Sequence, residues 1–173
     1  EPLKGVDILI KAVSQLEMGN SLRTLIVGGD LKKDPEMDRL QSLTQELGIA
    51  TQVSFLGRLD QHELPTYYSA ADICVVPSYY ESFSMVALES MACGTPVVAF
   101  SVGGLSTLVQ HGLTGYLVPQ CSYESLATNL ETLLSNPTLR QSMGQRARIL
   151  AKTMGWDNLA QRVSQIYNSL NTV

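Results

Sequence analysis

Two carboxylates, Glu81 and Glu89, flank a short stretch of small and apolar residues that lies between two apolar runs of the chain. Because such runs indicate buried strands, we expect Glu81 at the exit of one strand and Glu89 within the helix that follows. In an open α/β sheet, ligands bind outside the carboxyl ends of the strands, and the free amides of a helix start attract anions such as phosphate. The spacing therefore predicts a ligand site at residues 81–89.

Hydroxyl groups suit Glu81 and Glu89 better than phosphate does. A diphosphate would repel a carboxylate, whereas a sugar can donate two O–H bonds to it in a fixed geometry. Glu89 follows Met85 by about one helical turn, so the two side chains share one side of the expected helix. A glutamate taken alone is more often a solvated surface residue, and only the position beside a strand exit favours a ligand here.

The segment between the two carboxylates offers backbone amides. Ser82, Phe83, Ser84 and Met85 precede or open the expected helix, and the first amides of a helix have no partner within it. These amides could cradle a diphosphate. Alternatively, Ser82 or Ser84 could cap the helix with no ligand involved, and the loop alone favours neither interpretation.

Three residues elsewhere could complete such a site. Lys4 opens the first expected helix and could offset the charge of a leaving diphosphate, although a solvent-facing lysine fits the local pattern better. Gly57 and Arg58 end a strand at the same expected edge, where glycine allows a ligand to approach the backbone closely. Arg58 could stack on or bond to a base, but an ordinary surface arginine is the simpler interpretation.

The composition excludes several classes of function. The chain has 173 residues, 45% hydrophobic and 16% charged, which is enough for one buried core. Its net charge of −4, without a run of Lys or Arg, gives no reason to expect a nucleic acid as partner. The 3 cysteines are too few for a disulfide framework, and the 2 histidines lack metal-ligand spacing, so we expect no metal or other cofactor.

Other signatures are missing from the sequence as well. It contains no Walker loop, no Gly-x-Ser-x-Gly elbow and no Gly-x-Gly-x-x-Gly fingerprint, which argues against NTPase, hydrolase and NAD-dependent functions. Without an apolar run of about 18 residues, we expect no integral membrane segment. A cytoplasmic setting is expected, and peripheral contact with a membrane through another part of the protein is left open.

Helical and strand patterns alternate along the chain. The residues predict an α/β fold, a Rossmann-like parallel sheet with helices on both faces. Strands are expected at residues 25–29, 52–56, 73–76, 96–100 and 115–118, and helices at residues 3–18, 35–47, 62–70, 85–92, after 103–104, and through most of the chain from about 123, including 138–152 and 156–170.

The beginning and end of the chain are unusual for this architecture. A doubly wound unit normally begins with a strand, whereas this chain opens on a helix, so we expect the sheet to lack its first strand. The last helix is more than the sheet needs and is expected to pack on a partner domain. Residues 1–173 are therefore interpreted as a single domain from a larger protein.

Six segments together resemble the C-terminal, donor-binding domain of retaining GT-B glycosyltransferases. This group, of the glycosyl transferases group 1 type, includes sucrose-phosphate synthases, sucrose synthases and many α-glycosyltransferases. The segments are KGVDILI (4–10), LIVGG (25–29), VSFLG (53–57), ESFSMVALE (81–89), ACGTPVV (92–98) and GLTGYLV (112–118). Their order and spacing cover nearly the whole chain, so the resemblance is specific although each segment alone is weak.

The resemblance implies a role for each candidate residue. Glu81 would hold the transferred sugar and Lys4 would neutralise the departing diphosphate, which makes these two the candidate catalytic residues. Glu89 would bind the ribose. The remaining donor-binding residues would be Ser82, Phe83, Ser84, Met85, Val86, Gly57 and Arg58.

Two features depart from the family pattern. An Arg that shares the task of Lys4 stands in a Gly-Arg segment just upstream in the family, and this chain lacks it, so we expect weak donor binding. Ser84 stands where the family's loop usually has Gly. A side chain there would narrow the sugar pocket or require a slightly different backbone path.

The implied reaction is transfer of a hexosyl unit, with retention, from a UDP-sugar or GDP-sugar to an acceptor bound by an absent N-terminal domain. UDP-glucose is the expected donor, and this chain alone is expected to be inactive. Two alternatives stay open. One is a non-catalytic scaffold or interaction domain with the same fold, and the other is an enzyme that resembles UDP-sugar epimerases.

Overall fold

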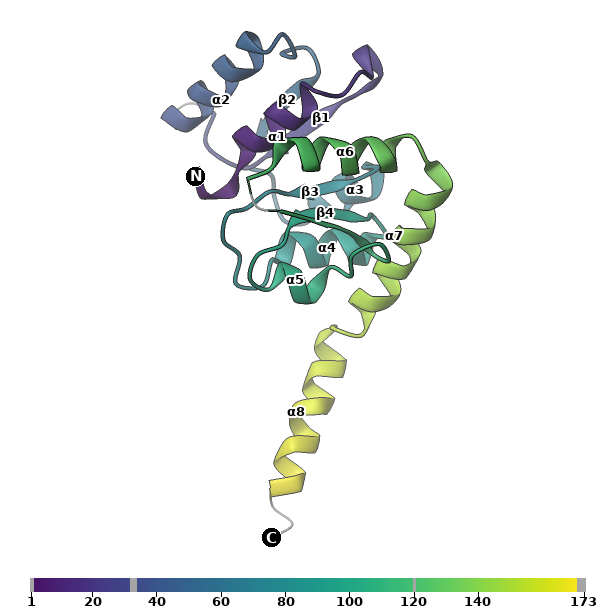
Figure 1. Ribbon diagram of the computed structural model, residues 1–173. Coiled ribbons are helices and arrows are strands. Elements are labelled where there is room, and N and C mark those ends of the chain that lie inside the picture. The colour runs from purple at the N-terminus through teal and green to yellow at the C-terminus, as the bar shows by residue number, and fades with distance from the viewer. Residues whose placement is uncertain (1, 32–33, 120, 171–173) are drawn as a thin grey trace.

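The computed structural model describes residues 2–31, 34–119 and 121–170, and it shows parallel strands covered by helices (Figure 1). The α/β prediction is confirmed. The strands are β1 (Thr24–Val27), β2 (Val53–Gly57), β3 (Cys74–Val76), β4 (Val97–Phe100) and β5 (Gly115–Val118). The α-helices are α1 (Val6–Val13), α2 (Pro35–Glu46), α3 (Leu64–Ala70), α4 (Met85–Cys93), α5 (Leu105–Leu108), α6 (Tyr123–Leu134), α7 (Pro137–Lys152) and α8 (Trp156–Leu170).

The strands form two parallel sheets rather than the single sheet expected from the sequence. One sheet has the order β1-β2 and the other the order β3-β4-β5. In the part of the chain that the structure describes, no strand bridges β1 and β3, so each of them pairs along one edge only. One further strand between β1 and β3 would join the two sheets. The expectation that the sheet lacks its first strand stays a prediction.

Helix α1 packs on both sheets and so holds them together. Its residues Ile8 and Ala12 are buried in the core of β4, β5 and α6, whereas Ile10 and Val13 are buried in the core of β1, β2 and α2. The helix is shorter than the predicted span of residues 3–18. Gly5 adopts a left-handed backbone with φ of 63°, which separates a 3-10 turn at Pro2–Lys4 from α1. Lys4 therefore lies in that turn and not within the helix.

Strand β4 lies at the centre of the larger sheet and is buried on both faces. Val98 and Phe100 contact the cluster that includes α1 and α6, while Val97 and Ala99 contact the cluster of α4, α5 and α7. This division follows from the two-residue period of a strand. Helices therefore cover both faces, as predicted, and the carboxyl ends of β3 and β4 open at the same edge.

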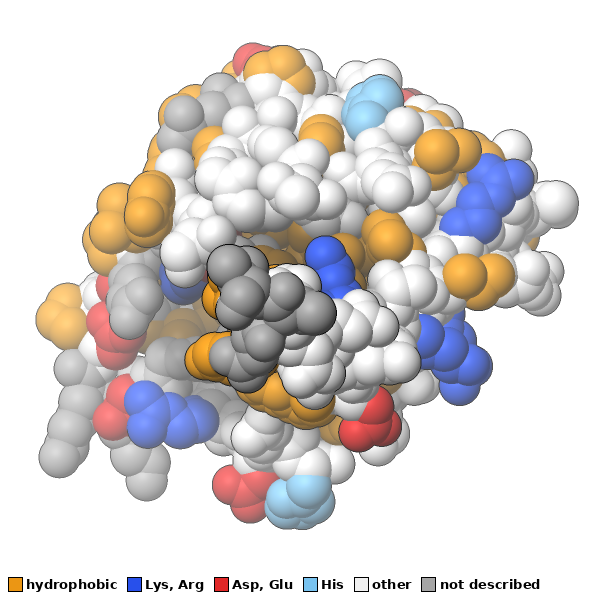
Figure 2. All heavy atoms as spheres, turned by 90° about the horizontal axis from the view of Figure 1, so that it is seen from below, with side chains coloured by type: hydrophobic (Ala, Val, Ile, Leu, Met, Phe, Trp, Pro, Cys, Tyr) orange, Lys and Arg blue, Asp and Glu red, His pale blue; other side chains and the backbone are white. Residues whose placement is uncertain are grey.

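Helix α8 extends away from the rest of the molecule (Figure 1) and buries none of its residues. One side of it is apolar, as the helical spacing of the exposed residues Trp156, Leu159, Val163, Ile166 and Leu170 shows. Figure 2 views the molecule from the C-terminal end of α8, and hydrophobic side chains are exposed beside the helix. Within the part of the chain that the structure describes, none of the helices has both the length and the apolar character that a membrane span needs.

Helix α4, which carries Glu89, packs closely against α7. A Cβ atom on Gly144 of α7 would overlap the carbonyl oxygen of Gly94, the residue that ends α4. Alanine normally stabilises a helix interior by about 1 kcal/mol relative to glycine. Here the overlap with the Gly94 carbonyl outweighs that gain in stability, because α4 and α7 cannot move apart without opening the buried core between them.

We therefore expect Gly144→Ala to lower the free energy of unfolding by about 1–3 kcal/mol, measured by urea denaturation. Gln145→Ala, at the exposed neighbouring position on α7, should change it by less than about 0.5 kcal/mol. A Gly144→Ala variant that is as stable as the original chain would contradict this account of α4 packing.

Candidate functional site

Glu81 lies in the loop that leaves β3, at the edge predicted from the sequence. Its carboxylate oxygen Oε1 lies 2.7 Å from Nζ of Lys4 and forms an ion pair with it. The same oxygen accepts a hydrogen bond of 3.1 Å from Oγ of Ser78, a buried residue. The structure therefore brings together the two residues predicted as catalytic, which are far apart in the sequence.

Backbone contacts fix Lys4 at this position. The amide of Tyr79 donates a 2.9 Å hydrogen bond to the carbonyl of Leu3, which ties the loop after β3 to the turn that carries Lys4. A Cβ atom on Gly5 would overlap the carbonyl oxygen of Pro77, so no other residue allows so close an approach. No local sequence pattern predicts these backbone contacts, although Lys4 and Glu81 were expected in the same site.

The loop from Glu81 to Ser84 rests on the start of α5. The amide of Gly104 donates a 3.1 Å hydrogen bond to the carbonyl of Glu81. Cβ atoms on Gly103 and Gly104 would overlap backbone atoms of Glu81, Ser82 and Phe83. We expected these glycines only to open a short helix, whereas they also support the loop of the candidate site.

Ser84 caps α4 from a left-handed conformation. Its φ of 75° lies in the region that favours glycine, the residue that the resemblance implies at this position. The side chain is buried and accepts a hydrogen bond of 3.4 Å from the amide of Ala87. Met85 and Val86, the first two residues of α4, have amides with no acceptor among the described residues. The helix start thus offers both a cap and free donors, and the two interpretations of this loop are compatible.

Glu89 lies on α4 and pairs with a tyrosine that the sequence analysis did not single out. The hydroxyl of Tyr68, on α3, donates a 3.2 Å hydrogen bond to Oε2 of Glu89. Burial, together with the nearby Cys74 and Glu89, raises the pKa of the Tyr68 phenol well above its usual range. The phenol therefore stays protonated at neutral pH and can orient the carboxylate as a donor.

Gly57 and Arg58 lie at the carboxyl end of β2, in the smaller sheet. Gly57 is buried with φ of 70°, and its carbonyl accepts a hydrogen bond of 2.6 Å from the amide of Gly28. Arg58 is exposed, and its side chain makes no hydrogen bond or ion pair within the described ranges. The structure places both at a strand exit, as predicted, but no hydrogen bond or ion pair within the described ranges joins them to the 81–89 segment.

Three apolar side chains next to the carboxylates face solvent. Phe83, Met85 and Val86 are 44%, 54% and 47% exposed, although they lie beside a well-packed core. Together with the ion pair and the free amides, they make a surface that combines apolar, anionic, cationic and donor groups. Such a mixture suits a ligand that has a ring, hydroxyl groups and an anionic part.

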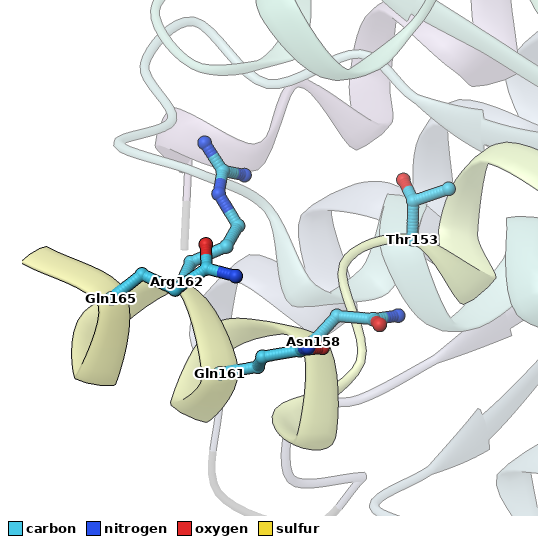
Figure 3. Close-up of a pocket in the computed structure, with 5 residues that line it drawn as sticks. All are labelled: Thr153, Asn158, Gln161, Arg162 and Gln165. Atoms are coloured by element: carbon cyan, nitrogen blue, oxygen red, sulfur yellow. The ribbon is translucent and has the colours of Figure 1, made fainter.

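A hollow near the C-terminal end of the described chain lies apart from the candidate site. It has a volume of about 360 Å³ between α7 and α8, and Figure 3 shows that its lining comes mainly from polar side chains of α8. None of its residues is a candidate site residue. Among the described residues, no cluster of three or more His, Cys, Asp or Glu is arranged to hold a metal ion.

Comparison with known proteins identifies the family. Residues 1–150 match the family described as "Glycosyl transferases group 1". The chain belongs to this family. It is 40% identical over 171 residues to the D-inositol 3-phosphate glycosyltransferase of Corynebacterium glutamicum (strain R), which covers 97% of this chain but only 41% of that protein. The chain thus spans less than half the length of such curated relatives.

Solved structures of other proteins have the same fold over this chain. The sucrose-phosphate synthase of Thermosynechococcus elongatus matches with a TM-score of 0.88 and 38% identity, over 98% of this chain and 43% of that one. HepE of Anabaena, in complex with UDP-glucose, matches with a TM-score of 0.84 and 28% identity, over 100% of this chain and 46% of that one. The resemblance to the C-terminal domain of GT-B glycosyltransferases is therefore confirmed.

The left-handed conformation of Ser84 leads to a stability prediction. A non-glycine residue in this conformation costs about 1–2 kcal/mol, whereas replacing a serine cap by glycine costs only a few tenths. After allowing for the greater freedom of glycine in the unfolded chain, we expect Ser84→Gly to raise the free energy of unfolding by about 0.5–1 kcal/mol.

Ser122→Gly is the matched control. Ser122 caps α6 in the same way, by accepting a 3.1 Å hydrogen bond from the amide of Ser125, but with an ordinary φ of −91°. The same substitution should lower the stability there. If chemical denaturation shows that both variants lose stability, then Ser84 is not strained.

Proposed function

We propose that this chain is the donor-binding part of a retaining glycosyltransferase that transfers a hexosyl unit from a UDP-glucose-like donor. The observation that carries the proposal is the placement of Lys4, Glu81 and the free amides of α4 at one edge of the sheet. A cation and a helix start can hold a diphosphate, and a carboxylate can hold sugar hydroxyls. The UDP-glucose complex of HepE, a structural relative, supports the choice of donor.

In this proposal the donor spans the two carboxylates. The diphosphate binds the amides of Met85 and Val86 at the start of α4, with Lys4 beside it. The transferred sugar binds Glu81, and the ribose binds Glu89 in the orientation that Tyr68 sets. The uridine base extends toward the exits of β1 and β2, where Gly57 and Arg58 lie.

The chemistry requires no nucleophile from this chain. In the proposed reaction the bond from the sugar to the diphosphate breaks, the acceptor hydroxyl attacks from the same face, and a leaving phosphate oxygen takes its proton. Negative charge grows on the diphosphate in the transition state, and Lys4 and the α4 dipole would stabilise that charge. These groups offset the charge without a metal ion, so we propose that none is required.

The acceptor is proposed to bind to another part of the full-length protein. The chain spans 41% of the curated relative and 43% of the sucrose-phosphate synthase chain, so more than half of each lies outside the match. An N-terminal domain would supply the acceptor site, and the apolar side of α8 would pack against it. A cytoplasmic location stays a prediction, as does the identity of the acceptor.

Titration with UDP followed by NMR tests the donor site directly. We expect chemical-shift changes at residues 81–89 and at Lys4, and Glu89→Gln should lower the UDP affinity about tenfold, as the loss of a charge-assisted hydrogen bond predicts. Glu131→Gln, which removes the same charge from an exposed position on α6, should leave the affinity unchanged.

Other outcomes would favour the alternatives. A chain that shows no shift changes at residues 81–89 with millimolar UDP or UDP-glucose would be better explained as a scaffold or interaction domain. An enzyme related to UDP-sugar epimerases is disfavoured by the family match, since residues 1–150 belong to a transferase family.

A further inference from the structure

Without a ligand, the two charged groups that would bind the donor are paired with each other. The ammonium group of Lys4 is paired at 2.7 Å with Oε1 of Glu81, the carboxylate that would hold the transferred sugar. Both groups would have to bind the donor, Lys4 through its diphosphate and Glu81 through its sugar hydroxyls. Neither can do so fully while they bind each other.

The two partners differ in mobility. The side chain of Glu81 is only 14% exposed, accepts a second hydrogen bond from Ser78, and belongs to a loop anchored to Gly104. The side chain of Lys4 is 50% exposed and has a long, flexible stem. Lys4 is therefore the partner that moves when the pair opens.

We propose that the Lys4–Glu81 pair is a latch that makes the site select intact nucleotide sugars over free nucleoside diphosphates. The proposal rests on the donor site described above. A free diphosphate must draw Lys4 away and leave the Glu81 carboxylate uncompensated beside its phosphates. A nucleotide sugar draws Lys4 away in the same manner, but its sugar hydroxyls then satisfy Glu81.

Re-formation of the Lys4–Glu81 pair would also favour release of the nucleoside diphosphate after transfer. After transfer, the sugar leaves Glu81 while the diphosphate still contacts Lys4. The freed carboxylate then competes with the phosphates for Lys4, and the pair re-forms as the nucleotide leaves. Because an ion pair whose cation is half exposed to solvent contributes little, the effect on affinity should be modest, about two- to fivefold.

A double-mutant cycle measured by calorimetry tests the latch. The affinities for UDP and for UDP-glucose are compared in the original chain, Lys4→Met, Glu81→Gln and the double variant. Glu81→Gln should strengthen UDP binding about two- to fivefold and weaken UDP-glucose binding. In the Lys4→Met background, Glu81→Gln should leave UDP binding nearly unchanged, because there is no pair left to open.

Asp72→Asn is the matched control. Asp72 pairs with Arg140 at 2.8 Å near the amino end of β3, the opposite end from Glu81, so this variant removes the same charge from another ion pair. It should change neither affinity by more than the error of the measurement.

The possible outcomes separate the hypotheses. Equal strengthening of UDP binding by Glu81→Gln with and without Lys4 would show simple repulsion of the phosphates and would overturn the latch. Unchanged or weaker UDP binding in Glu81→Gln would overturn it as well. A chain that binds neither UDP nor UDP-glucose would overturn the proposed function itself, and the latch with it.

Discussion

The candidate site depends on backbone segments that touch without side chains between them. Gly5 lies against Pro77, and Gly103 lies against Glu81, each so closely that a Cβ atom would overlap a carbonyl oxygen. The first contact fixes the turn that carries Lys4, and the second fixes the loop that carries its partner. Without both contacts, an ammonium group and a carboxylate from distant parts of the chain would not meet at 2.7 Å.

The rest of the site follows from where the strands end. The exits of β3 and β4 bring the Glu81 loop, α4 and the start of α5 to one edge, the edge at which parallel sheets generally bind ligands. The two carboxylates then acquire different neighbours. Glu81 has a cation and a buried serine, whereas Glu89 has a protonated phenol. In the proposed donor site, these two equivalent side chains would bind different parts of one ligand.

Much of the fold and the centre of the site could be predicted from the sequence. The apolar runs located all five strands to within a few residues, because buried parallel strands have few polar positions. Glu81 and Glu89 could be found because they flank a helix start. Ser78, Tyr68 and the supporting role of Gly103 could not, since these depend on contacts between segments that no local pattern specifies. The division into two sheets and the short α1 were missed for a similar reason, as pairing partners and the conformation of Gly5 are set by tertiary structure.

A structure of this chain with UDP-glucose bound tests the central claim most directly. The account predicts that the diphosphate contacts the first amides of α4, that the ammonium group of Lys4 leaves Glu81 for the phosphate oxygens, and that Glu81 and Glu89 bind the sugar and the ribose respectively. A diphosphate bound away from the start of α4, with the Lys4–Glu81 pair still closed, would contradict it.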